Sequence, residues 1–378
     1  MEAAPEPGRA SRVERLWCRD FRGLAETDLV LAPGLTVLIG ENAQGKTSIL
    51  EAVGWVARAR SFRGVGDGLL VRTGCEVAIL RAEITDGERS QLFEAEIRVS
   101  GRNRLLCNKQ PVSRARDLHG LLRVTVFAPD DLDIVKGGPG GRRTFLDEIL
   151  VSIALRYDAA QSDFERVLRQ RNALLRGGAR DAEARSTLDV FDVQLAAAAA
   201  EVVRGRLRLI ERLLPSVAAG YDALAGAPAA IAAEYLAEWA PDGVGPEDPI
   251  DDLLAAALVR SRRTEIERGV TLVGPHRDEW RLTIGGLDSR HQASQGEQRT
   301  LALALRLAGH RATAELTGAA PVLLLDDVFS ELDPVRSAAL VRELPPGQTL
   351  LTTAGAVPDS VVPESRLRVR AGRIEASG

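Results

Sequence analysis

The sequence predicts an α/β fold with a β-rich section and an inserted, mainly helical lobe. Three observations support this fold class. An apolar run at residues 35–39 leads through a glycine-containing loop into a helical pattern, and a second apolar run at 321–325 ends in two acids. Apolar residues alternate at 78–84 and 92–99, which is typical of paired strands. Ala- and Leu-rich helical patterns fill much of 142–268.

Composition limits the class of protein further. The chain has 378 residues, 45% of them hydrophobic, which is enough to bury a real core. Its three cysteines form no CxxC pair, so neither a disulfide framework nor a zinc site is indicated. No apolar run approaches the roughly 18 residues that a spanning helix needs, and residues 1–11 lack the apolar stretch of a signal peptide. We therefore expect a cytoplasmic protein with an unstructured N-terminal extension at residues 1–11.

Residues 40–47 match the phosphate-loop pattern GxxxxGK[ST]. The chain has only three lysines, and one of them, Lys46, stands where the pattern requires it. In such loops backbone N–H groups and a helix N-terminus surround the phosphates, so we predict ATP and Mg²⁺ as cofactors. Lys46 would neutralise the β- and γ-phosphates, and Thr47 would bind the metal. The alternative is a plain glycine turn. The predicted nucleotide contacts here are Gly40, Glu41, Asn42, Ala43, Gln44, Gly45, Lys46, Thr47 and Ser48.

Two adjacent acids follow the apolar run at 321–325. The carboxyl end of a buried parallel strand would present them beside the phosphate loop. We predict that Asp326 binds the metal, and that Asp327 faces the γ-phosphate and polarises the attacking water. The alternative, two acids that begin an exposed turn, does not explain the uninterrupted apolar run before them.

A polar glycine turn at 293–298 precedes an Ala/Leu-rich helix and resembles the LSGGQ signature of ABC and SMC-like ATPases. Ser294 and Gly296 match the signature, whereas Ala293 and Gln295 depart from it. The resemblance implies that Ser294 and Gly296 contact the γ-phosphate held by the opposite subunit, and Gln298 is assigned to the same nucleotide site. Residues 330–333, Ser-Glu-Leu-Asp, resemble the D-loop that crosses this dimer interface.

Further motifs, in their order and spacing, resemble the RecF family of bacterial recombination proteins. The resemblance implies an ATP-dependent homodimer that binds gapped DNA without sequence preference in repair and replication. It also implies that RecO and RecR are partners in loading RecA, and that weak, DNA-dependent ATP hydrolysis acts as a switch. The motifs are Phe21-Arg-Gly, the phosphate loop, Arg60-Ser-Phe-Arg63, Val126-Phe-Ala-Pro-Asp-Asp-Leu132, Arg142-Arg-Thr-Phe-Leu-Asp147, Leu272-Val-Gly-Pro-His-Arg-Asp278 and Ser294-Gln-Gly-Glu-Gln-Arg299.

Some positions depart from the ABC pattern. Asp327 stands where transporters often carry a glutamate, so we expect slow turnover. The switch histidine is missing, and Thr352 or Thr353 stands there instead. No metal-sensing glutamine can be assigned at the end of the apolar segment 124–127.

The motifs divide the chain into two lobes. Residues 12–125 and 285–378 are expected to form the ATPase lobe, and residues 126–284 the inserted lobe. About 250 residues separate Lys46 from Ser294 without sustained heptads, so the insertion is expected to be compact rather than a rod.

Basic residues gather at 98–116 without an acid among them, and they are our DNA-binding candidates. An ordinary solvated strand face would look the same. The candidates are Arg102, Arg104, Lys109, Arg114 and Arg116.

Two other functions would each require a further feature. A transporter motor would need a region that couples to a membrane subunit, and an ATP-gated nuclease would need a further cluster of metal-binding acids. Neither is apparent in the sequence.

Overall fold

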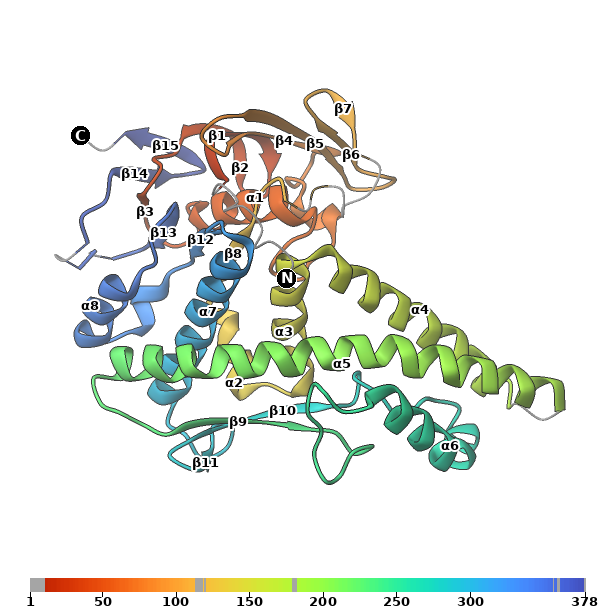
Figure 1. The fold of residues 1–378 in the computed structure, drawn as a ribbon. Helices are drawn as coiled ribbons and strands as arrows, with labels where there is room; N and C mark the ends of the chain where they lie inside the picture. Colours follow the sequence, from red (N-terminus) through yellow and green to blue (C-terminus); the bar gives the residue numbers. More distant parts are fainter. Residues whose placement is uncertain are drawn as a thin grey trace. The chain divides into compact units, whose positions relative to one another are not determined.

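The computed structural model describes residues 11–112, 118, 120–178, 182–355, 357–358 and 361–376 (Figure 1). The chain forms two compact units, one with residues up to 131, 220–228 and from 303 onward, the other with 132–219 and 229–302. The domain bounds expected from the sequence lie near 125 and 285, and those bounds stay a prediction. Among the described helices, none combines the length and apolar character needed to span a bilayer.

The first unit contains a six-stranded sheet with the order β15-β14-β3-β13-β12-β8. Neighbouring strands run parallel from β14 to β8, and β15 is antiparallel to β14. All four residues of β12 and all five of β13 are buried, as expected for parallel strands covered on both faces. The strands are β3 (Leu35–Ile39), β8 (Val124–Phe127), β12 (Val322–Leu325), β13 (Thr349–Thr353), β14 (Ser365–Arg370) and β15 (Arg373–Ala376).

The β-rich section is a second, antiparallel sheet with the order β2-β1-β4-β5-β6-β7. The alternating segments predicted to pair are β4 and β5, in which Ala82 lies opposite Phe93. Helix α1 (Lys46–Arg58) shares one apolar core with strands of both sheets, and its Trp55 is fully buried. The strands are β1 (Arg12–Phe21), β2 (Leu24–Val30), β4 (Val77–Thr85), β5 (Ser90–Arg98), β6 (Arg104–Cys107) and β7 (Gln110–Pro111).

Short helices complete this unit. Helix α8 (Pro334–Glu343) begins after Asp333, whose side chain accepts a hydrogen bond from the backbone N–H of Arg336 and so caps the helix. Two longer helices, α5 (Ala182–Ala225) and α7 (Gln295–Thr317), each contain residues of both units. The remaining elements are η1 (Asp67–Leu70), η3 (Pro129–Asp131) and η4 (Val328–Glu331).

The second unit is mainly helical but also contains a small antiparallel sheet, β11-β10-β9. The sequence predicts only helices from 142 to 268, so strand β9 (Ile231–Leu236) is a correction. It pairs with β10 (Glu279–Ile284), which is remote in sequence and therefore invisible to local patterns. The other elements are α2 (Leu132–Lys136), α3 (Pro139–Ile153), α4 (Leu155–Arg176), α5 (Ala182–Ala225), α6 (Ile250–Arg268), β11 (Leu287–Asp288) and α7 (Gln295–Thr317).

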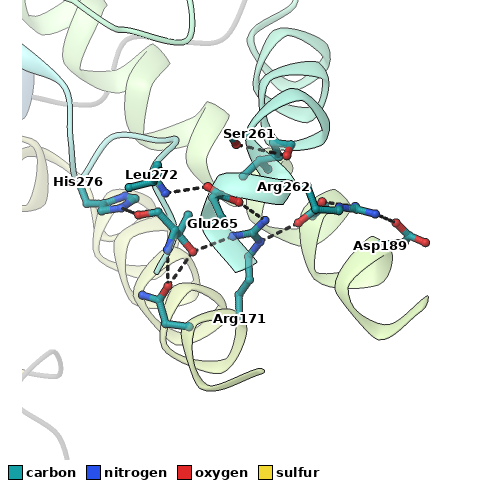
Figure 2. A network of polar contacts seen from close by, with 11 residues as sticks. Arg171, Asp189, Ser261, Arg262, Glu265, Leu272 and His276 are labelled. Carbon is teal, nitrogen blue, oxygen red and sulfur yellow. Dashed lines mark hydrogen bonds and ion pairs between the residues drawn. The ribbon is translucent and has the colours of Figure 1, made fainter. Parts of the chain in front are cut away.

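A buried arginine connects three helices of the second unit (Figure 2). Arg171 of α4 is fully buried and donates to Asp192 of α5 at 2.7 Å and to Glu265 of α6 at 2.6 Å. A third bond goes to the hydroxyl of Thr271 at 2.8 Å. Arg262 of α6 also pairs with Asp192, at the outer end of the network. Buried charges are stable only when they are paired and hydrogen-bonded, and here every partner of Arg171 comes from another segment.

Replacing Arg171 by Ala should destabilise the protein by about 3–5 kcal/mol, because Asp192 and Glu265 would be left as buried carboxylates without their main partner. Urea unfolding measures the loss. The matched control is Arg169→Ala, on the same helix, because Arg169 pairs with Glu165 at the exposed surface. That variant should change stability by about 0.5 kcal/mol or less. Equal effects of the two substitutions would contradict the role of the buried network.

Candidate functional site

The phosphate loop connects the end of β3 to the start of α1. Ala43 and Gly45 have positive φ angles of 64° and 105°, so the backbone turns in the left-handed region just before the helix begins at Lys46. Gly45 tolerates this conformation at no steric cost. The first turn of α1 therefore directs its unpaired N–H groups toward the space inside the loop.

The Lys46 side chain lies inside this loop. Its Nζ donates to the carbonyl oxygens of Gly40 at 2.6 Å and Glu41 at 2.8 Å, and only 6% of the residue is exposed. Burial lowers the pKa of Lys46, while the charges of Asp327 and Asp326 raise it. The ammonium group is thus held by backbone oxygens of its own loop, near two acids.

Asp326 connects three elements of the first unit. It follows β12, and its Oδ1 accepts hydrogen bonds from the hydroxyls of Thr47 on α1 at 2.9 Å and Thr352 on β13 at 2.8 Å. Burial raises the pKa of Asp326, although the bonds from Thr352 and Thr47 lower it. Parallel strands end at the same edge of the sheet, and for this reason residues nearly 300 positions apart in sequence meet here.

Asp327 has two unusual features. Its φ angle is 49°, in the left-handed region that non-glycine residues rarely adopt. Its Oδ1 is buried and has no hydrogen-bond partner among the described residues. The backbone N–H of Asp327 donates to Thr352 Oγ1 at 2.9 Å, so Thr352 holds both acids in place. An unsatisfied buried acceptor and backbone strain together are features that cluster at functional sites.

These groups surround one cavity of about 570 Å³. Six of its lining residues are not among the site residues predicted from the sequence, although Arg22, Gly23 and Arg63 stand in motifs singled out above. Arg22 is fixed by two hydrogen bonds of 2.8 Å to the buried Glu51. Leu69, Val71 and Thr73 carry no sequence signal, because folding alone brings them to the loop. The lining residues are Arg22, Gly23, Asn42, Ala43, Gly45, Lys46, Thr47, Ser48, Arg63, Leu69, Val71, Thr73, Asp326 and Asp327.

The signature-like turn lies in the second unit at the start of α7. Ser294 and Glu297 form a reciprocal cap: the Ser294 N–H and hydroxyl donate to the Glu297 carboxylate at 2.8 and 2.7 Å, and the Glu297 N–H donates to Ser294 Oγ at 3.3 Å. Gly296 lies in the first turn of the helix. The Gln298 amide is buried and donates to the carbonyls of Ser289 and Arg290, which holds the preceding turn.

The DNA-binding candidates differ in their surroundings. Arg104 lies 3.5 Å from Glu96 across the β5–β6 pair, and the same carboxylate also pairs with Arg98, so this strand face is not free of acids. Arg102 and Lys109 are exposed, and Lys109 lies in the tight turn between β6 and β7 with a φ of 66°. Arg114 and Arg116 lie outside the described residues.

The two sheets around α1, the phosphate loop and the paired acids define a phosphate-loop ATPase head of the ABC/SMC type. The family model for the RecF/RecN/SMC N terminal domain matches residues 12–350. The DNA replication and repair protein RecF of Frankia alni is 48% identical over 90% of this chain and 92% of its own length. The chain belongs to the RecF family.

Two further comparisons agree with this family. The DNA replication and repair protein RecF of Streptomyces avermitilis is 44% identical over 96% of this chain and 99% of its own. A solved structure of the recombination mediator protein RecF-ATP in the RecFOR pathway matches with a TM-score of 0.90 and 28% identity, covering 98% of both chains. The sequence-based identification of the family and fold class is thereby confirmed.

Replacing Asp326 by Asn should leave the ligand-free protein at least as stable as the wild type. The raised pKa of Asp326 means that burial disfavours its ionised form. This penalty is present at pH 7, shrinks as the pH falls through the folded-state pKa and is gone below the unfolded-state pKa. The sequence predicts that Asp326 binds Mg²⁺, so the variant should lose most of the stabilisation expected from Mg-ATP, about 2.7 kcal/mol at a ligand concentration of 100 Kd. Thermal unfolding with and without Mg-ATP measures both effects.

The control for this experiment is Asp28→Asn, at an exposed acid that pairs with Arg15. It should keep the full stabilisation by Mg-ATP. If the Asp326→Asn variant keeps it as well, Asp326 is not the metal-side acid.

Proposed function

We propose that this chain binds ATP with Mg²⁺ in the cavity beside α1 and hydrolyses it slowly. The observation that carries the proposal is the convergence of Lys46, Thr47 and both acids on one cavity. Mg²⁺ prefers oxygen ligands and is usually bound by one or two carboxylates together with substrate phosphates. The hydroxyl of Thr47 and the carboxylate of Asp326, 2.9 Å apart, fit this donor set. A solved relative described as RecF-ATP supports the choice of nucleotide.

Each residue has a proposed role at this site. Lys46 would exchange its contacts with the loop carbonyls for the β- and γ-phosphates, whose negative charge suits a buried ammonium. When bound, Mg²⁺ supplies neutralisation of the charge that develops on the phosphates. The apolar side chains of Leu69 and Val71, on the cavity wall, would contact the nucleoside part of ATP.

Asp327 is the proposed general base. Its buried Oδ1 lacks a partner among the described residues and is available to accept a proton from water. Thr352 fixes the backbone of Asp327 through a 2.9 Å hydrogen bond. Asp adopts left-handed backbone more readily than most residues, so the φ of 49° favours Asp over the longer Glu here. The shorter side chain holds water less closely, which supports slow hydrolysis and a switching role.

We further propose that ATP joins two copies of the chain into a homodimer. In this arrangement Ser294 and Gly296 of one copy contact the γ-phosphate held by the other. The Ser294–Glu297 cap supports this role, because it sets the first turn of α7, whose N–H groups suit an anion. The dimer would bind gapped DNA and, together with RecO and RecR, promote the loading of RecA. Relatives named DNA replication and repair protein support the DNA function.

Sedimentation tests the dimer directly. Wild-type protein should shift to a dimer when Mg-ATP is added, and the dimer should then bind gapped duplex DNA. The Lys46→Arg and Ser294→Arg variants should lose the shift, because the first disturbs the phosphate contacts and the second places a bulky cation at the signature turn. Ser90→Arg, at an exposed strand end of the antiparallel sheet, is the matched control and should dimerise normally.

The outcomes separate the parts of this proposal. A wild-type protein that stays monomeric with Mg-ATP at every concentration reached would overturn the signature assignment. Dimers that ignore DNA would leave the ATP mechanism in place and remove the repair function.

The basic candidates at 102–116 are the proposed DNA contacts, and among them Arg102 and Lys109 are exposed. Arg102→Ala and Lys109→Ala should each weaken DNA binding and lower the slope of log affinity against log salt by about 1, because each removes roughly one phosphate contact. Titrations of labelled duplex at several salt concentrations measure the slope. Arg15→Ala is the control, because Asp28 already pairs with this arginine through two hydrogen bonds. Unchanged slopes in both test variants would exclude this surface.

A further inference from the structure

The turn between β14 and β15 lies against the outside of the phosphate loop. The backbone N–H of Ala371 donates to Gln44 Oε1 at 2.6 Å, and the N–H of Gly372 donates to the Gln44 carbonyl at 2.9 Å. Both oxygens of one loop residue are therefore bound by a hairpin more than 300 residues away in sequence. All of these residues belong to the same compact unit.

The hairpin turn fits closely among its neighbours. Gly372 has a φ of 73°, and a Cβ placed on it would lie 2.6 Å from the carbonyl oxygen of Gly23, in the turn between β1 and β2. Its own carbonyl accepts a hydrogen bond of 3.0 Å from the buried Thr27 hydroxyl. At the start of the phosphate loop, a Cβ on Gly40 would lie 2.3 Å from the Val369 carbonyl oxygen of β14. The hairpin thus contacts the loop at two points.

Gln44 differs from its neighbours in the loop. Asn42, Ala43, Gly45 and Lys46 line the cavity, and Gln44 does not. Its half-buried side chain instead accepts a hydrogen bond from the hairpin turn. Because Gln44 contacts the hairpin and not the cavity, it can affect a bound ligand only by fixing the position of the loop backbone.

We propose that the β14–β15 hairpin is a positioning element for the phosphate loop. Through the contacts of Gln44 and Gly372, the hairpin would hold the loop in the shape that binds nucleotide, and losing these contacts would lower the affinity for nucleotide. The inference rests on the proposed ATP site and adds the support that keeps the loop in its binding shape. A loop that is already ordered pays less entropy when it binds its ligand. Linkage is reciprocal, so a bound nucleotide must also hold the hairpin turn more firmly.

Two glycine variants test the proposal. Gly372→Ala forces the hairpin turn away from Gly23, and its affinity for a fluorescent ATP analogue should fall about tenfold, the effect of losing one or two net hydrogen bonds. Gly286→Ala is the matched control. Gly286 is also the second residue of a two-residue hairpin turn, between β10 and β11, with a φ of 80°, but a Cβ there meets nothing within 4 Å. Its affinity should stay within about twofold of the wild type, since only its backbone conformation is strained.

Gln44→Ala tests the same proposal without adding a side chain at a strained turn position. It should weaken binding of the analogue by about three- to tenfold through loss of the Ala371 bond, while the thermal unfolding midpoint stays close to that of the wild type. Hydrogen exchange of residues 365–373 gives a second readout: the analogue should slow it in the wild type and slow it less in the Gln44→Ala variant.

The outcomes distinguish this inference from the proposed function. If the wild type does not bind the analogue, the proposed ATP site fails. If the wild type binds it and both Gly372→Ala and Gln44→Ala bind equally well, with exchange of the hairpin unaffected by ligand, the positioning role is overturned and the ATP site stands.

Discussion

The hydrogen bonds to the Asp326 carboxylate are the interaction on which the site depends. One of its oxygens accepts hydrogen bonds from the hydroxyls of Thr47 and Thr352. Helix α1 and strands β12 and β13 are therefore fixed to each other at the carboxyl edge of the sheet. Burial raises the pKa of Asp326, and the hydrogen bonds from Thr352 and Thr47 act against this by favouring the ionised carboxylate. The position of the phosphate loop relative to both acids follows from this single carboxylate.

Several features of the site are energetically unfavourable in themselves, and the packing of the surrounding fold stabilises them. Lys46 is desolvated among carbonyl oxygens, Asp327 has an unusual backbone conformation, and its Oδ1 has no partner among the described residues. Such features persist only where the neighbouring structure determines them strongly. Here that structure comprises the buried strands on one side and, as we propose, the β14–β15 hairpin on the other.

Local motifs predicted the parts of the fold and site that depend on neighbours in sequence. The phosphate loop lies between β3 and α1 because glycines and an apolar run specify that turn, and the two acids follow a fully buried strand as expected. The features that the sequence does not predict depend on contacts between segments that are distant in sequence. Strand β9 is Ala-rich and pairs with β10, and Leu69, Val71 and Thr73 reach the cavity only through the folded β-rich section. The pairing of Arg104 with Glu96 was missed because the acid lies just outside the basic segment.

The burial of the Arg171 network has a consequence for the behaviour of the protein in electrolytes. Dissolved ions screen charges that face water, and they act much less on pairs from which water is excluded. Arg171 and Glu265 are fully buried, whereas the basic side chains of Arg102 and Lys109 are exposed. High ionic strength should therefore release the DNA that we propose these surface charges bind, and leave the helices around Arg171 folded. The release of DNA and the unfolding of the protein should therefore occur at different salt concentrations. Elution from a column with salt should yield folded protein.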